Sequence, residues 1–463
     1  MDNRQYIPRL IFWETTKGCN LKCLHCRAIP EMMTSREDLS TEEGYKLIDQ
    51  IVEFSNPILV LSGGEPLYRR DIFDLATYGI NKGLRLSLAT NGTLIDSKMA
   101  DKIKDTGFAR VSISLDGGNA GTHDRFRAIM GSFNKAIEGL KYLIERGVST
   151  QINTTIAKHN YKELPQILEL ALKLGVDALH TFLLVPVGCG VDIAEDQMVS
   201  ADTYEEILHW FYDQSKLHPI DLKATCAPHY FRVRAERILE EKKAGLKPTP
   251  FIPHGTKLKA GHVDKVTIPK STGTVKATTH GLSAMTKGCL AGTGVCFISH
   301  KGEVFPCGYL PAKAGDVRKE HFKDIWHFSK VFGNLRNPDL LKGKCGICEF
   351  KHICLGCRAR AYSATGDYLD EEPFCSYNPS DKNVERGFSL AEVETAHTEA
   401  DGVMPELSMS WTQDAKNIIA RIPFFIRKTA VKNIEDYARA NNIASITVDI
   451  VKKIREMKGG EAA

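Results

Sequence analysis

Short apolar runs alternate with longer helical patterns along the first half of the chain. Six apolar runs predict β-strands, at residues 11–15, 58–62, 84–89, 111–115, 151–156 and 178–185. Between them, apolar residues at helical spacing predict helices near residues 41–54, 72–82, 98–106, 133–146 and 162–174. This alternation predicts parallel βαβ units in an α/β fold, and six repeats favour a partial (β/α)6 barrel of the TIM type. An open doubly wound sheet is the alternative that the periodicity leaves open.

The alternation stops near residue 240, where the composition changes. Eight lysines lie between Lys242 and Lys276 against one acid, Asp264, which is typical of a flexible basic linker or lid. Beyond it come a cysteine-rich segment that predicts a small α+β domain, a second linker and a small helical module. The predicted boundaries are 1–239 for the α/β core, 240–285 for the linker or lid, 286–378 for the cysteine-rich domain, 379–405 for the second linker and 406–463 for the module.

Composition places few other limits on function. The chain has 463 residues and a formal net charge of +4, which is too small to indicate nucleic-acid binding. No apolar run reaches the roughly 20 residues that span a bilayer, and the N-terminus lacks the pattern of a signal peptide. Both observations predict a cytoplasmic protein with no membrane span. In that compartment, 13 cysteines indicate metal binding rather than disulfides.

Three of these cysteines, Cys19, Cys23 and Cys26, follow the first predicted strand at the spacing C-x3-C-x2-C. Three thiolates can hold three irons of a [4Fe–4S] cluster and leave the fourth iron open to a small molecule. A structural zinc site is the alternative, but it needs four ligands. His25 lies between two of the cysteines and cannot easily turn onto the same metal. The spacing therefore favours an iron–sulfur cluster.

The cysteine-rich domain holds as many cysteines as two fully ligated [4Fe–4S] clusters require. They are Cys289, Cys296, Cys307, Cys345, Cys348, Cys354, Cys357 and Cys375. Cys296 alternates like a strand residue within 295–299, so it could instead be a core residue and leave one cluster with an open iron. Zinc in the C-x2-C pairs is the other alternative.

The C-x3-C-x2-C stretch resembles the cluster motif of the radical S-adenosylmethionine (radical SAM) enzymes, in which SAM binds the open iron. The resemblance covers residues 8–225 and implies a radical SAM barrel whose catalytic cluster is held by Cys19, Cys23 and Cys26. It also implies that the SAM site includes Gly63, Gly64, Glu65, Asn91, Ser114, Asp116, Arg127 and Asn153. Turn chemistry is the alternative for the Asn-Gly and Asp-Gly pairs, and a solvent-facing charge is the alternative for Arg127.

The second group of cysteines resembles the SPASM extension of radical SAM enzymes, which carries auxiliary [4Fe–4S] clusters with interleaved ligands. One or two such clusters are therefore expected. Position by position, the implied ligand sets are Cys289, Cys296, Cys307 and Cys357, and Cys345, Cys348, Cys354 and Cys375. Cys354 and Cys357, the final close pair, are separated by two residues in this chain. The SPASM extension often has three residues at this place, and the difference concerns the role of Cys357.

Four further stretches resemble proteins of tetrapyrrole synthesis. Residues 422–447 are similar to the C-terminal module of light-independent protochlorophyllide reductases. Residues 185–190, 224–230 and 286–294 resemble the radical SAM branch that finishes haem by the siroheme-dependent route. Within these stretches Cys189 and Cys226 are interpreted as buried free thiols, with a catalytic thiol as the alternative for each. His229 could meet a metal or a carboxylate, although a lone histidine is more often structural.

The last resemblance implies oxidative decarboxylation of two propionates of Fe-coproporphyrin III to vinyl groups, which gives haem b. A 5′-deoxyadenosyl radical from SAM would take hydrogen from each propionate, and the leftover electron would pass to the auxiliary clusters. The implied partners are the tetrapyrrole and a small electron donor such as flavodoxin or ferredoxin. Three alternatives stay open: a sister enzyme that deacetylates 12,18-didecarboxysiroheme, a peptide- or protein-maturing SPASM enzyme, and a non-catalytic tetrapyrrole carrier or iron–sulfur electron-transfer protein.

Overall fold

The computed structural model describes residues 6–245, 288–379, 407–420, 424–441 and 443–459. The chain divides into two compact units, one of residues 1–232 with 287–385 and the other of residues 233–286 with 386–463. The predicted linker or lid lies outside the described residues apart from 240–245, and so does the second linker apart from Pro379.

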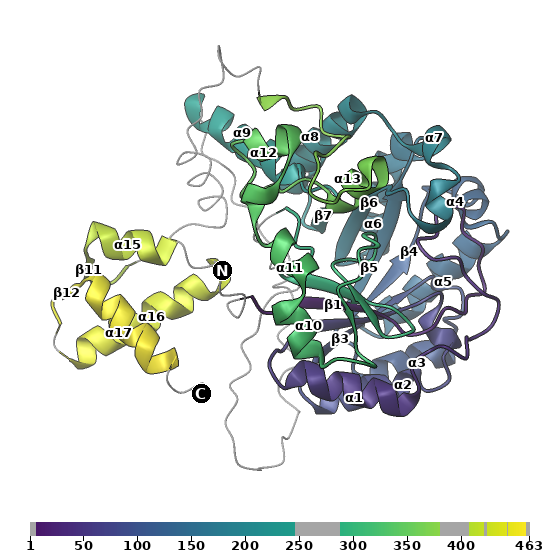
Figure 1. Cartoon of the computed structure of the whole chain (residues 1–463), viewed down its shortest axis with the longest axis horizontal. Helices are drawn as coiled ribbons and strands as arrows, with labels where there is room; N and C mark the ends of the chain where they lie inside the picture. Colours follow the sequence, from purple (N-terminus) through teal and green to yellow (C-terminus); the bar gives the residue numbers. More distant parts are fainter. Residues whose placement is uncertain (1–5, 246–287, 380–406, 421–423, 442, 460–463) are drawn as a thin grey trace. The chain divides into compact units, whose positions relative to one another are not determined.

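A parallel sheet forms the centre of the larger unit (Figure 1). Seven strands lie side by side in chain order and run parallel: β1 (Leu10–Glu14), β2 (Ile58–Ser62), β3 (Arg85–Thr90), β4 (Arg110–Ser114), β5 (Thr150–Ile156), β6 (Ala178–Leu183) and β7 (Asp221–Thr225). The six predicted strands are confirmed as β1 to β6, within two residues at either end. The seventh was not predicted, because the sequence Asp-Leu-Lys-Ala-Thr carries too few apolar residues to distinguish it from a loop.

Helices connect the strands and pack on the sheet. The five predicted helices are confirmed as α1 (Thr41–Val52), α2 (Ile72–Asn81), α3 (Ser97–Thr106), α5 (Ser132–Glu145) and α6 (Leu164–Leu174). A capping box fixes the start of α1: Ser40 Oγ accepts a hydrogen bond from Glu43 N, and Glu43 Oε2 accepts one from Ser40 N. The prediction missed α4 (Ala120–Arg127), α7 (Ala194–Gln197), α8 (Ala201–Leu217) and α9 (Tyr230–Lys243).

The cysteine-rich segment extends the same sheet. Strand β8 (Val295–Ile298) pairs in parallel with the free edge of β1, and β9 (Glu303–Phe305) and β10 (Gly315–Asp316) follow antiparallel. Four short helices complete the segment, α10 (Phe322–Phe328), α11 (Lys330–Leu335), α12 (Gly343–Ile347) and α13 (Arg358–Thr365). The segment predicted as a separate domain thus shares one compact unit with the α/β core.

The described part of the C-terminal module has its own small core. It contains β11 (Ser410–Trp411), α15 (Gln413–Ala420), α16 (Phe424–Ala440), β12 (Ser445–Ile446) and α17 (Val448–Gly459). Trp411, Ile419 and Ile434 are buried in this core, and the buried Glu435 carboxylate accepts a hydrogen bond from Trp411 Nε1 at 3.0 Å. The predicted helical module is therefore confirmed, with a two-stranded pairing added.

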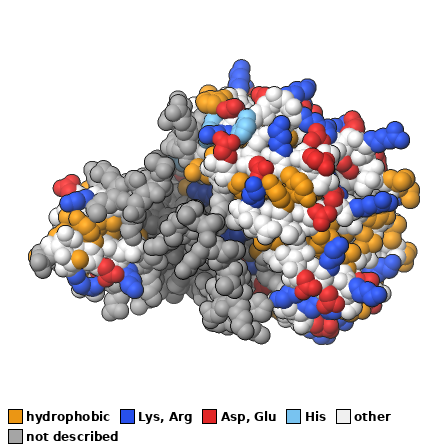
Figure 2. All heavy atoms as spheres, turned by 90° about the horizontal axis from the view of Figure 1, so that it is seen from below, with side chains coloured by type: hydrophobic (Ala, Val, Ile, Leu, Met, Phe, Trp, Pro, Cys, Tyr) orange, Lys and Arg blue, Asp and Glu red, His pale blue; other side chains and the backbone are white. Residues whose placement is uncertain are grey.

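The surface shows no strong charge bias on the side that Figure 2 presents, where acidic and basic side chains are interspersed over the larger unit. Among the described helices, none combines the length and apolar character that a membrane span requires.

Candidate active site

The loop after β1 brings three thiols together. Cys19 and Cys23 are buried and Cys26 is partly buried. The three side chains pack together with that of Leu21. Burial raises the pKa of the Cys19 thiol to about 12 and that of the Cys26 thiol to about 11. Such thiols are thiolates only when a metal replaces the proton. The arrangement suits the predicted three-cysteine cluster.

The glycines after β2 hold this loop in place. Gly64 N donates to Thr16 O, and Glu65 N donates to Gly18 O, both at 2.7 Å. A Cβ added to Gly64 would lie 2.4 Å from Gly18 O and 2.5 Å from Lys17 O, so only glycine permits this approach. Both glycines lie against the chain's own backbone, and their predicted contact with a ligand stays a prediction.

Glu65 joins the ends of β2 and β3. Its fully buried carboxylate accepts from Leu67 N at 3.1 Å, Thr90 Oγ1 at 2.7 Å and Asn91 N at 2.8 Å. Burial raises the pKa of Glu65 to about 7, although these three donors oppose the shift. Asn91 in turn donates from Nδ2 to Asn20 Oδ1 at 2.8 Å. Glu65 and Asn91, both predicted as site residues, therefore contact the loop that carries Cys19, Cys23 and Cys26.

Asp116 and Arg127 form a buried ion pair beside the same loop. Arg127 Nη2 lies 2.6 Å from Asp116 Oδ2, and Arg127 Nη1 donates to Cys23 Sγ at 3.5 Å. Burial alone would raise the pKa of Asp116, but the Arg127 guanidinium holds it below its usual range. Both residues contact the cluster loop, Asp116 through His25 Nε2 at 3.4 Å and Arg127 through Cys23, and their predicted place in the SAM site stays a prediction.

Ser114 ends β4, and it lies beside Asn153 in the middle of β5. They are register partners on adjacent parallel strands, and both are partly exposed. Gln151 Nε2 donates to Asn153 Oδ1 at 2.6 Å, which orients the amide. The structure thus brings these two predicted residues together, and Ser114 lies at the edge where parallel α/β sheets bind ligands.

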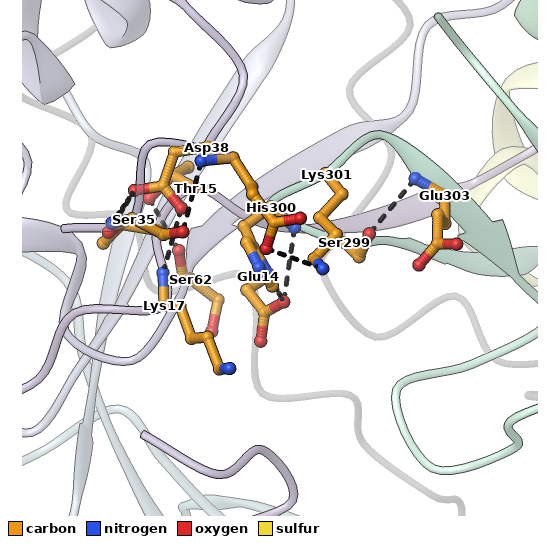
Figure 3. Close-up of polar contacts among 12 residues, drawn as sticks. Glu14, Thr15, Lys17, Ser35, Asp38, Ser62, Ser299, His300, Lys301 and Glu303 are labelled. Atoms are coloured by element: carbon orange, nitrogen blue, oxygen red, sulfur yellow. Dashed lines mark hydrogen bonds and ion pairs between the residues drawn. The ribbon is translucent and has the colours of Figure 1, made fainter. Parts of the chain in front are cut away.

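A second network at the end of β1 was missed by the sequence reasoning. Glu14 Oε1 accepts from Arg27 Nη2 at 2.6 Å, and Glu14 Oε2 lies 2.7 Å from His300 Nδ1. Figure 3 shows Glu14 and His300 facing one another, next to Ser299 in the turn that follows β8 and Glu303 at the start of β9. Burial would raise the pKa of Glu14, but Arg27 and His300 hold it at about 2. The sequence offered one signal for this network, because the acidic residue Glu14 ends the otherwise apolar strand β1.

The second group of thiols forms two sets. Cys345, Cys348, Cys354 and Cys375 line one cavity together with His229, as the second predicted ligand set requires. Of the first predicted set, Cys289, Cys307 and Cys357 pack in one core, but Cys296 lies elsewhere, in β8 opposite Ile11. Cys226, which the sequence did not group with them, joins the three. Among the described residues, no three His, Cys, Asp or Glu side chains converge as the ligands of one metal ion would. A [4Fe–4S] cluster instead takes each thiolate on a different iron.

Known families match three parts of the chain. Residues 13–171 match the radical SAM superfamily, 289–357 match an iron–sulfur cluster-binding domain, and 411–455 match the proto-chlorophyllide reductase 57 kD subunit. An AdoMet-dependent heme synthase of Methanosarcina barkeri is 48% identical over 375 residues, which cover 81% of this chain and 98% of the relative. The chain belongs to the AdoMet-dependent heme synthase family. As a radical SAM protein of this family, it uses a [4Fe–4S] cluster with SAM, and its SPASM segment carries auxiliary iron–sulfur chemistry.

Two more distant similarities extend the comparison. The Fe-coproporphyrin III synthase of the same organism is 29% identical over 381 residues, covering 79% of this chain and 87% of that protein. The structure of Streptococcus suis SuiB bound to S-adenosylmethionine superposes with a TM-score of 0.58, covering 80% of this chain and 78% of SuiB. At 16% identity, SuiB shows the fold alone. The predicted partial radical SAM barrel is confirmed.

Proposed function

We propose that this heme synthase family member converts Fe-coproporphyrin III to haem b by oxidative decarboxylation of two propionates. One observation carries the proposal: the chain resembles the heme synthase of Methanosarcina barkeri far more closely than the Fe-coproporphyrin III synthase of that organism. The geometry supports it, because thiols for one catalytic and two auxiliary clusters lie within one compact unit.

The cluster loop supplies the catalytic centre. When bound to Cys19, Cys23 and Cys26, the cluster supplies the electron that cleaves SAM to methionine and a 5′-deoxyadenosyl radical. We assign SAM binding to the strand ends that surround the loop, at Gly63, Gly64, Glu65, Asn91 and Ser114, and to Asn153 in β5. Asp116 and Arg127 complete the predicted set, and we assign them to fixing Cys23 in the loop.

Each turnover leaves one electron that must go elsewhere. Loss of a hydrogen atom and CO2 from a propionate forms the vinyl group only when one further electron departs. Thiols that could hold an acceptor cluster lie near the catalytic loop. Gly308, the neighbour of Cys307, lies against Arg27, the neighbour of Cys26, because a Cβ on Gly308 would lie 3.3 Å from Arg27 Cδ. Tyr309 packs against the core of Cys289, Cys307 and Cys357. The auxiliary thiol set therefore lies one residue contact away from the catalytic loop.

The remaining parts of the proposal concern the cell. We infer that the protein works in the cytoplasm and that a small electron donor such as flavodoxin or ferredoxin reduces the catalytic cluster. The tetrapyrrole substrate follows from the family.

An anaerobic assay tests the proposal. The protein is reconstituted with iron and sulfide, reduced, and given SAM and Fe-coproporphyrin III, and products are followed by mass spectrometry. We expect haem b, a monovinyl intermediate and 5′-deoxyadenosine. Deoxyadenosine without change in the porphyrin would reject this substrate and make 12,18-didecarboxysiroheme or a peptide the next trial. An intact cluster that forms no deoxyadenosine would reject the enzyme and favour a carrier or electron-transfer protein.

A further inference from the structure

We propose that Cys226 is the fourth protein ligand of the auxiliary cluster held by Cys289, Cys307 and Cys357. Cys296, which occupies that place in the motif, is then a core residue. The inference rests on the auxiliary cluster of the proposed function, but it concerns the ligands and not the substrate.

The position of Cys226 in the fold carries the argument. Cys226 directly follows β7, so it lies at the carboxyl end of the parallel sheet, and its backbone is left-handed with a φ of 55°. Few non-glycine residues adopt this conformation without a local reason. Cys226 packs against the same buried core as Cys289, Cys307 and Cys357, together with Val185 and Leu310. Burial raises the pKa of Cys226 well above its usual range, and charge on any of those three thiols would raise it further.

Backbone contacts fix the relation between Cys226 and Cys289. Cys289 N donates to Cys354 O at 3.1 Å, and the preceding Gly288 N donates to Ile353 O at 2.6 Å. A Cβ on Gly288 would lie 2.8 Å from Pro228 O and 2.3 Å from Cys354 O. The segment that carries Cys289 is therefore confined between the loop of Cys226 and the segment at 353–354. Main-chain contact therefore holds the segment of Cys289 against the loop that carries Cys226.

Cys296 has the surroundings of a core residue. It is fully buried in β8, in register with Ile11 of β1. Burial raises the pKa of the Cys296 thiol, and the Arg336 guanidinium, which donates to Gly292 O at 2.8 Å and Trp326 O at 2.7 Å, lowers it by less. A free cysteine in such a place behaves as a small apolar side chain.

The ligand assignment has a functional consequence. Four thiolates satisfy all four irons of the cluster, so no iron stays open to bind substrate. A closed cluster suits electron transfer, whereas a three-cysteine cluster could bind a substrate group directly. Cys226 therefore decides between the two roles that the sequence left open.

The test compares Cys226→Ala with Cys296→Ala in the full chain. Both are reconstituted anaerobically, and iron, acid-labile sulfide, and Mössbauer and EPR spectra are measured without tetrapyrrole. We expect Cys226→Ala to lose between about one and about four irons per chain and to change the signal of one auxiliary cluster. Cys296→Ala should keep the iron content and every cluster signal of the parent. The EPR change on adding SAM, which reports the catalytic cluster, should persist in both.

The opposite pattern would overturn the assignment: parent spectra for Cys226→Ala, or a lost auxiliary signal for Cys296→Ala. If Cys226→Ala binds no cluster at all, Cys226→Ser decides. Serine oxygen can replace the thiolate, so retained iron with a shifted auxiliary signal supports ligation, and unchanged spectra reject it. These readouts need no substrate, so failure of the haem assay would not affect them.

Discussion

Buried charges at the cluster loop need partners. Asp116 is fully buried, and the low dielectric around it makes an unpaired carboxylate costly. Arg127 supplies the countercharge and, with its second nitrogen, a hydrogen bond to Cys23 Sγ. One guanidinium therefore couples the stability of the β4 end to the position of a cluster ligand.

Removing this guanidinium should release the loop. We expect Arg127→Ala to destabilise the protein by about 3–5 kcal/mol, because Asp116 would stay buried without its guanidinium partner. The occupancy of the catalytic cluster should fall, as measured by iron analysis and by the SAM-dependent EPR signal. Arg125→Ala is the matched control, since Arg125 lies on the same helix α4 but is exposed. An equal loss in both variants would contradict the role given to Arg127.

Glu14 should make stability depend on pH in a defined window. Its pKa is about 2 in the folded chain against 4.5 as the ordinary value. A depressed carboxyl pKa stabilises the fold above pH 4.5, and this contribution is lost as the pH falls towards 2. At about 1.4 kcal/mol per pH unit, the contribution is up to about 3 kcal/mol.

Glu14→Gln should remove that contribution. In the metal-free chain, urea unfolding followed by tryptophan fluorescence should show lower stability at pH 7 and a flatter profile between pH 4.5 and 2. Glu37→Gln serves as the control, because Glu37 is an exposed partner of Lys301 and contributes little. Parallel profiles for the parent and Glu14→Gln would show that the buried network is not the source of the pH dependence.

At the scale of elements, the carboxyl ends of neighbouring strands act together. The β2 turn supports the β1 loop through backbone hydrogen bonds, and Glu65 joins that turn to the end of β3. Parallel strands place these ends at one edge of the sheet. Residues from separate βα units thus become one site.

Gly64→Ala should disrupt this contact between elements. The new methyl group would meet the carbonyl oxygens of Lys17 and Gly18, which are backbone atoms and cannot rotate away. We expect SAM cleavage to fall about 100-fold, because a cluster displaced by about 1 Å loses its reactive geometry. Gly294→Ala is the control, since its nearest neighbour would lie 3.8 Å from the new Cβ. Cleavage of SAM at the parent rate by Gly64→Ala would refute the explanation.

On the scale of the molecule, the SPASM segment and the α/β core form one unit. Strand β8 completes the edge of β1, and Glu14 binds both Arg27 of the catalytic loop and His300 of the turn after β8. The described core of the C-terminal module, by contrast, is made of its own residues, including Trp411 and Ile434.

A chain ending after residue 385 should therefore keep its cluster chemistry. All the predicted ligands precede residue 380, and 375 aligned residues cover 98% of a heme synthase that is shorter than this chain. We expect unchanged iron content and an unchanged rate of 5′-deoxyadenosine formation, measured after anaerobic reconstitution. Loss of the clusters on truncation would instead give the module a structural role.

Local patterns in the sequence determined most of the fold. The strands β1 to β6 and the five predicted helices α1, α2, α3, α5 and α6 follow from apolar periodicity. The C-x3-C-x2-C spacing predicts three ligands within one loop. These features depend on residues a few positions apart, so the sequence alone contains them. The strand β7 escaped notice because its five residues bury little apolar surface of their own and are held by pairing with β6.

Only the tertiary structure decided which distant residues meet. Cys226 joins Cys289, Cys307 and Cys357 because the end of β7 and the SPASM segment converge, and no spacing along the chain encodes that convergence. Cys296 matches the motif by position but faces the core, since pairing of β8 with β1 sets its direction. Glu14 and His300 likewise meet across 286 residues of chain. Sequence spacing limits what one loop can bind, whereas packing of separate elements determines which loops share a site.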